Sequence, residues 1–349
     1  MNAQETMQPK VTKETKNKIR VEFERTPLKE RLKAKFLSLF FLKKVVWYIF
    51  RLVLLVGISY VVLFPFFSKI AGSFMSAEDF VDVTVRLIPK HFTLETYKAI
   101  ILENGYFEAF KNTLTLSLIC AVLQTLSCCL VGYGLAKFKF KGNKLIFLLV
   151  IFTMVLPHQT LSFSFSINFT YFWKGLFGLL HAIHLVPDKL ANGWNMINTH
   201  WPMMLLSATS LAFKNGLYIF LFRQFFRGVP DELEESAYID GSGIFRTFVQ
   251  IILPLSVPMM ITVFLFSFCW QWTDDFYTNI FYTTARMKLM PGIVDIPTSL
   301  MTDFAAKDLY YAAIKNTCGI LIILPLIILY AFCQKFLVQG IERSGLTAD

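Results

Sequence analysis

The chain has 349 residues, of which 55% are hydrophobic and 37 are phenylalanine, a composition that excludes an average soluble enzyme and favours helices in lipid. The net charge of +10 does not indicate nucleic-acid binding, because Lys and Arg gather beside apolar segments, in residues 10–44 and 137–144. This distribution is typical of the cytoplasmic loops of membrane proteins. The six cysteines lie in apolar runs without disulfide or zinc-ligand spacing, so we expect buried, reduced thiols.

Residues 1–44 form a polar, basic extension. Pro27 separates its first part from a helix-like stretch, residues 28–44, which either lies on an anionic lipid surface or is a solvated tail that sets the orientation of the chain. The first apolar run covers residues 45–67 and is long enough to cross a hydrocarbon core of about 30 Å. Because this run starts so late, we expect no cleavable signal peptide.

The second predicted span, residues 110–137, carries small or polar residues within an otherwise apolar helix. Such residues usually mark contacts between membrane helices. They are Asn112, Thr113, Thr115, Ser117, Gln124 and Ser127. Residues 68–106, which precede this span and carry as many acids as bases, are predicted to form an outer connection.

The third predicted span, residues 145–165, is interrupted at Pro157, which precedes His158 and Gln159. A proline there frees backbone groups, so the kink is expected inside a helix bundle or beside a cavity. Residues 167–200 are rich in aromatic residues and predict an interfacial helix pair on the outer face. Three histidines of this region, His181, His184 and His200, lack an acidic or thiol partner, so we expect no metal site.

The fourth predicted span, residues 202–226, contains Lys214, and an ionisable residue at membrane depth is a functional candidate. We expect the span to break at Gly216 and to leave Lys214 in a wet vestibule. The alternative is an unbroken span in which the long side chain of Lys214 reaches the interface.

An acid-rich segment, residues 228–250, follows the fourth span. Pro230 and Asp231 predict a helix start, because proline tolerates the first turn and an acid favours the positive end of the helix dipole. Asp240-Gly241 predicts its end, since glycine accepts the left-handed conformation that a sharp turn requires.

Three further elements complete the prediction. A second short helix covers residues 244–253, and Pro254 marks the start of the fifth span, residues 252–272. The outer end of this span carries the cluster Trp270 to Phe276, and an outer loop reaches to residue 315. The sixth span, residues 316–336, is expected to kink at Pro325.

The acid-rich segment resembles the cytoplasmic coupling loop, called the EAA loop, of permease subunits of bacterial ATP-binding-cassette (ABC) importers. The family pattern E-A-A-x-x-D-G, followed by hydrophobic-x-L-P, stands here as Glu235-Ser236-Ala237-Tyr238-Ile239-Asp240-Gly241 and Ile252-Leu253-Pro254. Serine replaces the first alanine and keeps that side chain small. Asn112-Thr113-Leu114 and the basic turn Tyr133 to Gly142 are similar to the same family, and the Trp270 to Phe276 cluster resembles its carbohydrate branch.

The resemblance covers residues 45–342 and implies an all-α membrane protein with six transmembrane helices and the MetI/MalG-like fold of type I importer permeases. It implies a bacterial inner-membrane location with both termini in the cytoplasm. The expected parts are the extension 1–44, a permease domain 45–338 with an extracytoplasmic insertion at 167–200 and the coupling loop at 228–250, and a tail 339–349.

The resemblance also implies the partners: a second homologous permease, two ABC ATPase subunits and an extracytoplasmic solute-binding protein. The chain has no G-x-x-x-x-G-K-[ST] loop, so we expect no cofactor and no enzyme site of its own, with ATP used by the partner ATPases. A stand-alone secondary transporter or channel is the alternative, but such proteins usually show internal repeats and embedded acids, which are not apparent here.

Two sets of site residues are expected. The ATPase-coupling set is Glu234, Glu235, Ser236, Ala237, Asp240, Gly241 and Pro254. The substrate-pathway set is Gln159, Lys214, Trp270, Gln271, Trp272, Asp274 and Asp275. Aromatic faces suit pyranose rings, and Gln and Asp bind hydroxyl groups, which predicts a sugar or oligosaccharide. The alternative for the tryptophans is a belt that anchors the fifth span at the interface.

Overall fold

The computed structural model describes residues 11–15, 18–21, 39–183, 187, 192–212, 214–283, 287–303 and 306–345. The chain divides into two units, residues 1–68 and 69–349. In the first unit, β1 (Val11–Thr15) and β2 (Lys18–Val21) pair as an antiparallel hairpin. The all-α prediction is therefore wrong for this hairpin, where β-branched residues favour extended backbone. Of the helix expected at 28–44, the part before residue 39 lies outside the described residues.

α2 (Leu39–Gly72) contains the first predicted span and extends it at both ends. In the second unit, the outer connection forms η1 (Glu78–Phe80) and α3 (Glu95–Glu103). α4 (Tyr106–Lys137) then confirms the helix predicted at 110–137.

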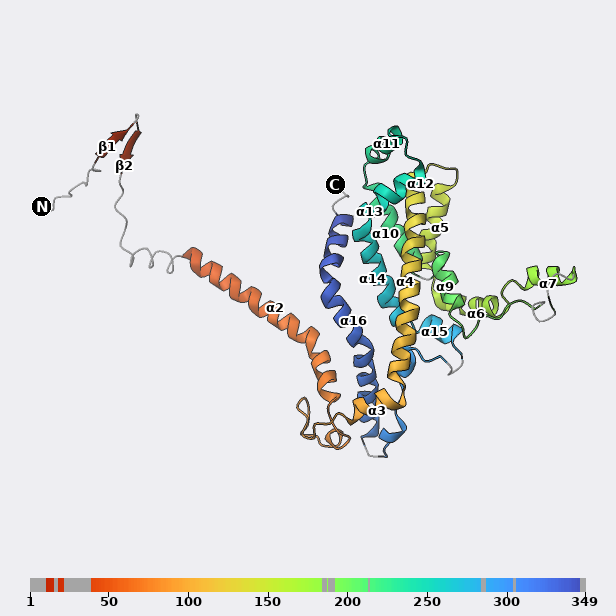
Figure 1. The fold of residues 1–349 in the computed structure, drawn as a ribbon. Helices are drawn as coiled ribbons and strands as arrows, with labels where there is room; N and C mark the ends of the chain where they lie inside the picture. The colour runs from red at the N-terminus through yellow and green to blue at the C-terminus, as the bar shows by residue number, and fades with distance from the viewer. Residues whose placement is uncertain are drawn as a thin grey trace. The chain divides into compact units, whose positions relative to one another are not determined.

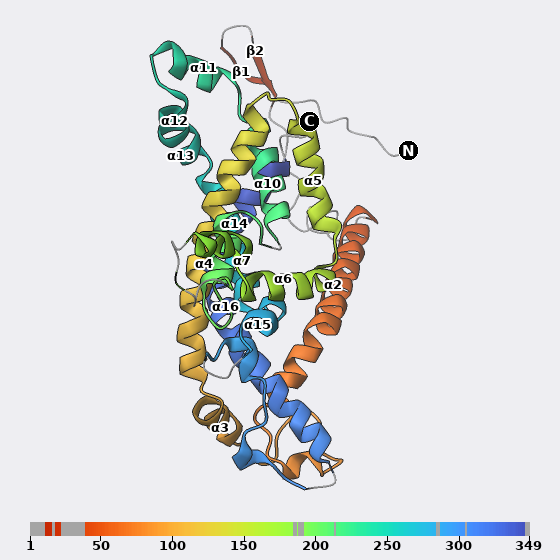
Figure 2. The ribbon, with the colours of Figure 1, turned by 90° about the vertical axis from the view of Figure 1, so that its right-hand side faces the viewer.

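α4 is the central helix of the second unit. α9 (Trp201–Ala208), α10 (Asn215–Arg227) and α14 (Val257–Trp272) pack on it, as both side views show (Figure 1, Figure 2). It contributes buried residues to each of three apolar clusters in the described part of the unit.

The polar side chains of α4 confirm that such residues mark helix contacts. The Gln124 amide donates to Ser207 Oγ of α9 (3.1 Å) and accepts a hydrogen bond from Ser267 of α14. Ser127 Oγ donates to the Ser207 carbonyl (2.8 Å). Three others of the predicted set differ: Thr115 is exposed and bonds to its own helix, Asn112 donates to the Lys288 carbonyl in a loop, and the buried Ser117 Oγ has no hydrogen-bond partner in the described part of the chain.

Glycine lets α10 approach the backbone of α4. A Cβ at Gly132 would lie 2.5 Å from Phe222 Cβ and 3.1 Å from the Arg223 nitrogen. Small residues allow this closeness between membrane helices, where packing replaces the hydrophobic effect as the driving force.

The third predicted span is bent. α5 (Asn143–Val155) ends before Pro157, and the chain turns by 100° into η2 (His158–Leu161) and α6 (Ser162–Thr170). Proline restricts the preceding residue to extended backbone, and Leu156 has ψ 126°. The predicted interruption at Pro157 is confirmed, and the two parts form a bent pair that is either one broken span or a re-entrant loop.

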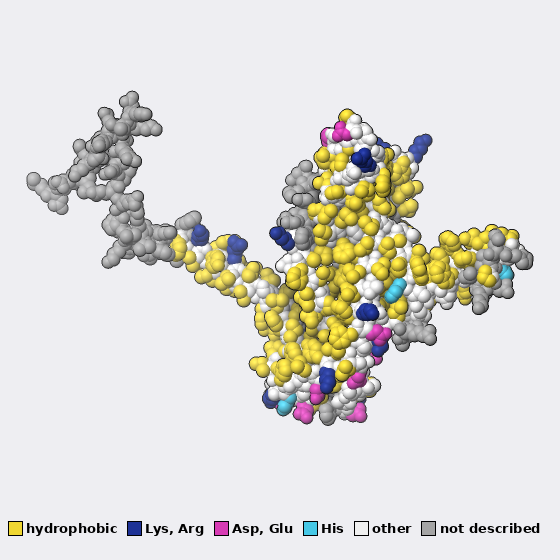
Figure 3. Space-filling view, viewed as in Figure 1, with side chains coloured by type: hydrophobic (Ala, Val, Ile, Leu, Met, Phe, Trp, Pro, Cys, Tyr) yellow, Lys and Arg dark blue, Asp and Glu magenta, His cyan; other side chains and the backbone are white. Residues whose placement is uncertain are grey.

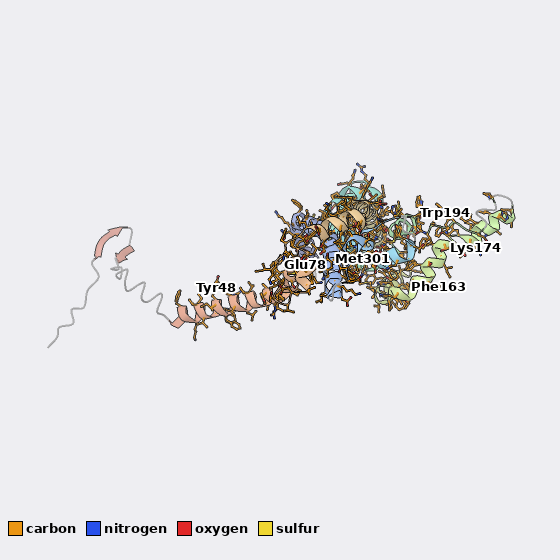
Figure 4. All side chains as sticks on the ribbon, turned by 90° about the horizontal axis from the view of Figure 1, so that it is seen from below. Tyr48, Glu78, Phe163, Lys174, Trp194 and Met301 are labelled. Carbon is orange, nitrogen blue, oxygen red and sulfur yellow. The ribbon has the colours of Figure 1, made fainter. Side chains whose placement is uncertain are left out.

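The 167–200 region carries one complete helix in its described part, α7 (Lys174–Ala182). Residues 184–186 and 188–191 lie outside the described residues, so the expected helix pair stays a prediction. α6 begins before the region and ends within it. An isolated antiparallel β-bridge pairs Phe172 with Trp194. Figure 4 shows Phe163, Lys174 and Trp194 in this part of the chain. His184 lies outside the described residues.

The fourth predicted span is broken, although not at Gly216. α9 ends at Ala208 and α10 begins at Asn215. Ser210 between them has φ 58°, and the amides of Leu211 and Ala212 both donate to the Leu206 carbonyl (2.9 Å each). The unbroken alternative is therefore wrong.

The acid-rich segment forms α11 (Glu232–Ile239) and α12 (Ile244–Thr247). A π-helical turn, η3 (Phe248–Ile252), and α13 (Leu253–Leu255) then extend the second short helix past its predicted end. The chain bends by 73° before α14, so the residues of the predicted fifth span are divided between the two arms of a bent pair. Pro254 and Pro258 lack the amide hydrogens that an unbroken helix uses, which accounts for the bend.

After α14 come α15 (Phe276–Phe281), η4 (Met290–Ile293) and η5 (Thr298–Leu300). α16 (Lys307–Gly345) begins before the predicted sixth span, continues through Pro325 and includes part of the expected tail. Two of the cysteines, Cys269 and Cys333, are half-buried rather than buried.

Among the described residues, α2, α4 and α16 are single helices long and apolar enough to cross a membrane, and two bent pairs raise the number to five. The broken pair α9 and α10 does not pass this test. Figure 3 shows a broad belt of apolar side chains between the two ends of the second unit. The structure thus gives a helical multi-pass architecture without fixing the number of spans at six.

Candidate functional site

A cavity of about 250 Å³ lies where α4, α10 and α14 meet. Its polar and aromatic lining includes Gln124, Lys214, Tyr218, Ser267, Trp270 and Gln271. The turn between α14 and α15 adds Asp274 and Asp275. Gln124 lies near the middle of α4, so the cavity is deeper along the bundle than the outer position expected for the Trp270 to Asp275 cluster.

An aromatic stack with a cation forms one wall of the cavity. Lys214 Nζ lies 4.4 Å from the centroid of the Trp270 ring, within range of a cation–π interaction. The rings of Tyr218 and Phe266 stack on Trp270, with centroid distances of 5.9 and 6.2 Å. Trp270 remains 39% exposed, which leaves part of its ring accessible from the cavity.

Asp274 has a structural contact in addition to its place in the lining. Its Oδ2 accepts the backbone amides of Tyr277 (3.1 Å) and Thr278 (3.3 Å), at the start of α15. Asp275, in contrast, is exposed. The two carboxylates therefore differ: one is held in place, and the other is available to a solute.

Five residues of the expected substrate pathway line this cavity, and two do not. Trp272 is only 1% exposed, its Nε1 donates to the Ile322 carbonyl (2.9 Å), and its ring meets the edge of Phe110. Gln159 is exposed on η2 and is not part of the lining.

Seven lining residues were absent from the sequence-based pathway, among them Gln124, Tyr218 and Ser267. Gln124 had a usable signal, because it is a large polar residue within an apolar helix. Tyr218 and Ser267 had none, since their position beside the cavity depends on the break before α10 and on the packing of α14.

The first helix of the acid-rich segment 228–250, α11, ends where the sequence indicates. Gly241 has φ 81°, its amide donates to the Tyr238 carbonyl (3.0 Å), and the Ser242 amide donates to Ala237 (2.9 Å). This pair of bonds is the Schellman motif, in which a left-handed residue satisfies the last carbonyls of a helix. Asp240 precedes the turn and is exposed.

α11 has an inner and an outer face. Glu234 and Ala237 are buried, whereas Glu235 and Ser236 are exposed. Several large apolar side chains are also exposed on this segment, among them Ile239 (86%) and Phe245 (78%). Pro254 is exposed on α13. The exposed side of this segment thus carries acids next to large apolar side chains. These apolar side chains are in contact with water unless a partner covers them.

Lys137, the last residue of α4, connects the start of the acid-rich segment 228–250 to the helix bundle through hydrogen bonds. Its side chain is only 7% exposed, and Nζ donates to the Val229 carbonyl (2.7 Å) and to Asp231 Oδ1 (2.5 Å). Glu234 Oε1 lies 3.8 Å away. The hydrogen bond from Lys137 lowers the pKa of Asp231, whereas burial raises the pKa of Glu234 and Lys137 opposes that rise.

Residues 129–343 match the family described as "Binding-protein-dependent transport system inner membrane component". This match covers more than half of the chain. The chain belongs to this family. It is therefore the permease subunit of an ABC importer, a multi-pass inner-membrane protein that works with ATPase and binding-protein partners.

Curated relatives of this permease align over most of their length. It is 28% identical over 295 residues to the arabinooligosaccharides transport system permease protein of Bacillus subtilis, covering 83% of this chain and 92% of that protein. It is 26% identical over 305 residues to the galactooligosaccharides transport system permease protein of the same organism, with coverages of 85% and 94%.

A solved structure supports the fold. The crystal structure of a bacterial ABC transporter involved in the import of the acidic polysaccharide alginate contains a chain similar to the permease, with a TM-score of 0.60 and 16% identity. The similarity covers 84% of this chain and 97% of that chain. The MetI-type permease fold is therefore established.

The contacts of Lys137 predict a local effect of its loss. Lys137→Met removes charged hydrogen bonds worth about 1.5–3 kcal/mol, so amide hydrogen exchange in residues 229–241 should accelerate about tenfold or more. Adding Glu234→Gln should recover part of the protection, because it removes the buried carboxylate left without its cation. Lys335→Met, at an exposed lysine of α16, is the matched control. Equal exchange in Lys137→Met and the control would show that Lys137 does not hold the segment.

Proposed function

We propose that this permease forms half of the translocation pore of an importer for a sugar or oligosaccharide, and that the cavity beside Trp270 borders the solute path. The observation that carries the proposal is the cavity lining, in which an accessible indole face lies next to amide and carboxylate side chains. Aromatic faces pack on the apolar faces of pyranose rings, while Gln271 and Asp275 offer hydrogen-bond partners for hydroxyl groups. The oligosaccharide names of two relatives support the same solute class.

The other half of the pore is a second homologous permease in this proposal. Two ATPase subunits bind ATP and dock on α11 and α12, and an extracytoplasmic protein delivers the solute. This chain itself holds no cofactor and has no enzyme site. Support comes from the acidic and apolar outer face of α11, which offers Glu235, Ser236 and Ile239 to a partner.

Movement of α11 would then switch the pore between inward-facing and outward-facing states. The ATPases can shift this equilibrium only if their contacts with α11 differ between the two states. The proposed coupling residues fall into two groups: exposed Glu235, Ser236 and Asp240 for the partner, and buried Glu234 and Ala237 for the bundle.

The proposal includes six spans, with the broken pair α9 and α10 as the fourth, and with both termini and α11 in the cytoplasm. The extension 1–44 and the tail 339–349 lie inside, and the insertion 167–200 lies outside. The basic residues at 137–144 support this orientation.

Cysteine labelling in a background without the native cysteines tests this topology. Lys141→Cys and Tyr238→Cys should react with a membrane-impermeant reagent only after the membrane is opened, because both positions face the cytoplasm. Labelling of either position in intact cells would contradict the orientation.

A comparison of two tryptophans tests the solute path. Trp270→Ala removes a ring from the cavity and should lower uptake about tenfold, the equivalent of 1.4 kcal/mol of lost contact, in a complex of normal composition. Trp272→Ala removes a buried ring and should destabilise the protein by about 3–5 kcal/mol. The measurements are uptake of arabino- or galactooligosaccharides by the reconstituted complex and its thermal unfolding. Normal uptake by Trp270→Ala would show that the solute path does not pass along the cavity beside Trp270.

A comparison of two glycines tests the coupling role of α11. Gly241→Val forces a left-handed valine, which costs about 1–3 kcal/mol, whereas Gly243 has φ −78° and tolerates the same change. A Cβ at either position meets no atom within 4 Å, so backbone conformation is the difference between them. Gly241→Val should lose ATPase retention or solute-stimulated hydrolysis, and Gly243→Val should keep both. Equal ATPase retention and equal solute-stimulated hydrolysis in the two variants would show that the end of α11 has no role in coupling.

A further inference from the structure

A second, larger hollow of about 820 Å³ lies at the end of the bundle that carries α11, away from the solute cavity. It is formed by the last residues of α4, the turn 138–142, the start of α5 and the end of α10. Five cations line it: Lys139, Lys141, Lys144, Arg223 and Arg227. No carboxylate is part of its described lining. Lys and Arg side chains are visible at this end of the molecule (Figure 3).

The nearby acids neutralise these cations only in part: after the hydrogen bond from Lys137, Lys139 also helps to lower the pKa of Asp231 without forming an ion pair with it. Asp231 and Glu234, at the start of α11, are engaged by Lys137. Among the described residues, none of the five cations of the hollow forms an ion pair. The hollow therefore carries a concentrated positive charge that a mobile anion would stabilise.

Arg223, which lines the hollow, also carries a buried donor without an acceptor among the described residues. Its guanidinium carbon lies 3.7 Å from the centroid of the Phe147 ring, which fixes the side chain in place. Its Nε is buried and has no hydrogen-bond partner in the described part of the chain. The guanidinium of Arg223 therefore keeps its positive charge beside the hollow without an anionic partner in the described part of the chain.

The remaining wall of the hollow is apolar. Phe138 and Phe140 are 41% and 43% exposed, and Leu145 is 61% exposed. Cations next to exposed apolar side chains match a molecule with a phosphate at one end and hydrocarbon at the other. Inorganic phosphate would leave the apolar wall in water.

We propose that this hollow binds the headgroup of an anionic phospholipid of the cytoplasmic leaflet. The proposal rests on the orientation proposed above, which places the turn 138–142 at the leaflet that attracts basic segments. The headgroup phosphate lies among Lys139, Lys141, Lys144 and the guanidinium groups of Arg223 and Arg227. The glycerol and the first methylenes lie on Phe138, Phe140 and Leu145. A bound lipid would therefore join the ends of α4, α5 and α10 next to the coupling segment.

The test uses the full transporter complex in nanodiscs of phosphatidylcholine with increasing phosphatidylglycerol. Native mass spectrometry then counts the phosphatidylglycerol that stays bound after transfer to detergent. Arg223→Gln with Lys144→Gln should weaken retention about tenfold or more, since each basic residue near the surface contributes about 1 kcal/mol. Lys98→Gln with Lys111→Gln is the matched control, because it removes the same charge from exposed lysines of α3 and of the first turns of α4, away from the hollow.

A second variant covers the case in which loss of Arg223 disturbs folding. Lys139→Gln with Lys141→Gln changes only exposed side chains and should also lower retention. Equal retention in these variants and the control overturns the lipid site. Displacement of the lipid by excess inorganic phosphate overturns it in favour of free phosphate, and loss of the ATPase without loss of lipid overturns it in favour of a protein contact. Lipid retention is measured without any transport assay. A negative result therefore rejects the lipid site alone and leaves the proposed importer function untouched.

Discussion

The structure depends on how α4 satisfies the backbone groups that a broken helix releases. In hydrocarbon, an unpaired carbonyl costs several kcal/mol, so a helix can break only where a neighbour supplies a donor. α9 ends beside α4, and there Ser127 donates to the Ser207 carbonyl (2.8 Å), while the amides of Leu211 and Ala212 donate to the Leu206 carbonyl (2.9 Å each). The polar side chains of one apolar helix thus permit the break between two others.

The solute cavity is a consequence of that break. The chain between α9 and α10 brings Lys214 over the Trp270 ring, and Gln124 holds the facing side of α14 through Ser267. Had residues 202–226 formed one continuous helix, α10 side chains would occupy this space. The same bonds that satisfy the broken backbone therefore also open the cavity and place polar groups around it.

One helix also connects the cavity with the coupling segment. Gln124 lines the cavity, and Lys137, at the end of the same helix, holds Asp231 and the Val229 carbonyl. At 1.5 Å per residue these two positions lie about 20 Å apart along α4. Because Gly132 packs directly on the α10 backbone between them, a shift of α11 relative to α4 would have to move α10 as well. The geometry supplies a contiguous physical link for the proposed coupling.

The sequence by itself determined the features that depend on neighbouring residues. The extent of α4, the interruption at Pro157 and the left-handed Gly241 all follow from local apolar runs, from proline and from glycine. The family also follows from short motifs. Only the tertiary structure decided which of two similar tryptophans meets the cavity: Trp270 is accessible, whereas Trp272 is buried against Ile322, fifty residues further along the chain. The same holds for the break before Asn215 and for the buried position of Lys137, because each depends on donors and acceptors that the fold brings together from distant parts of the sequence.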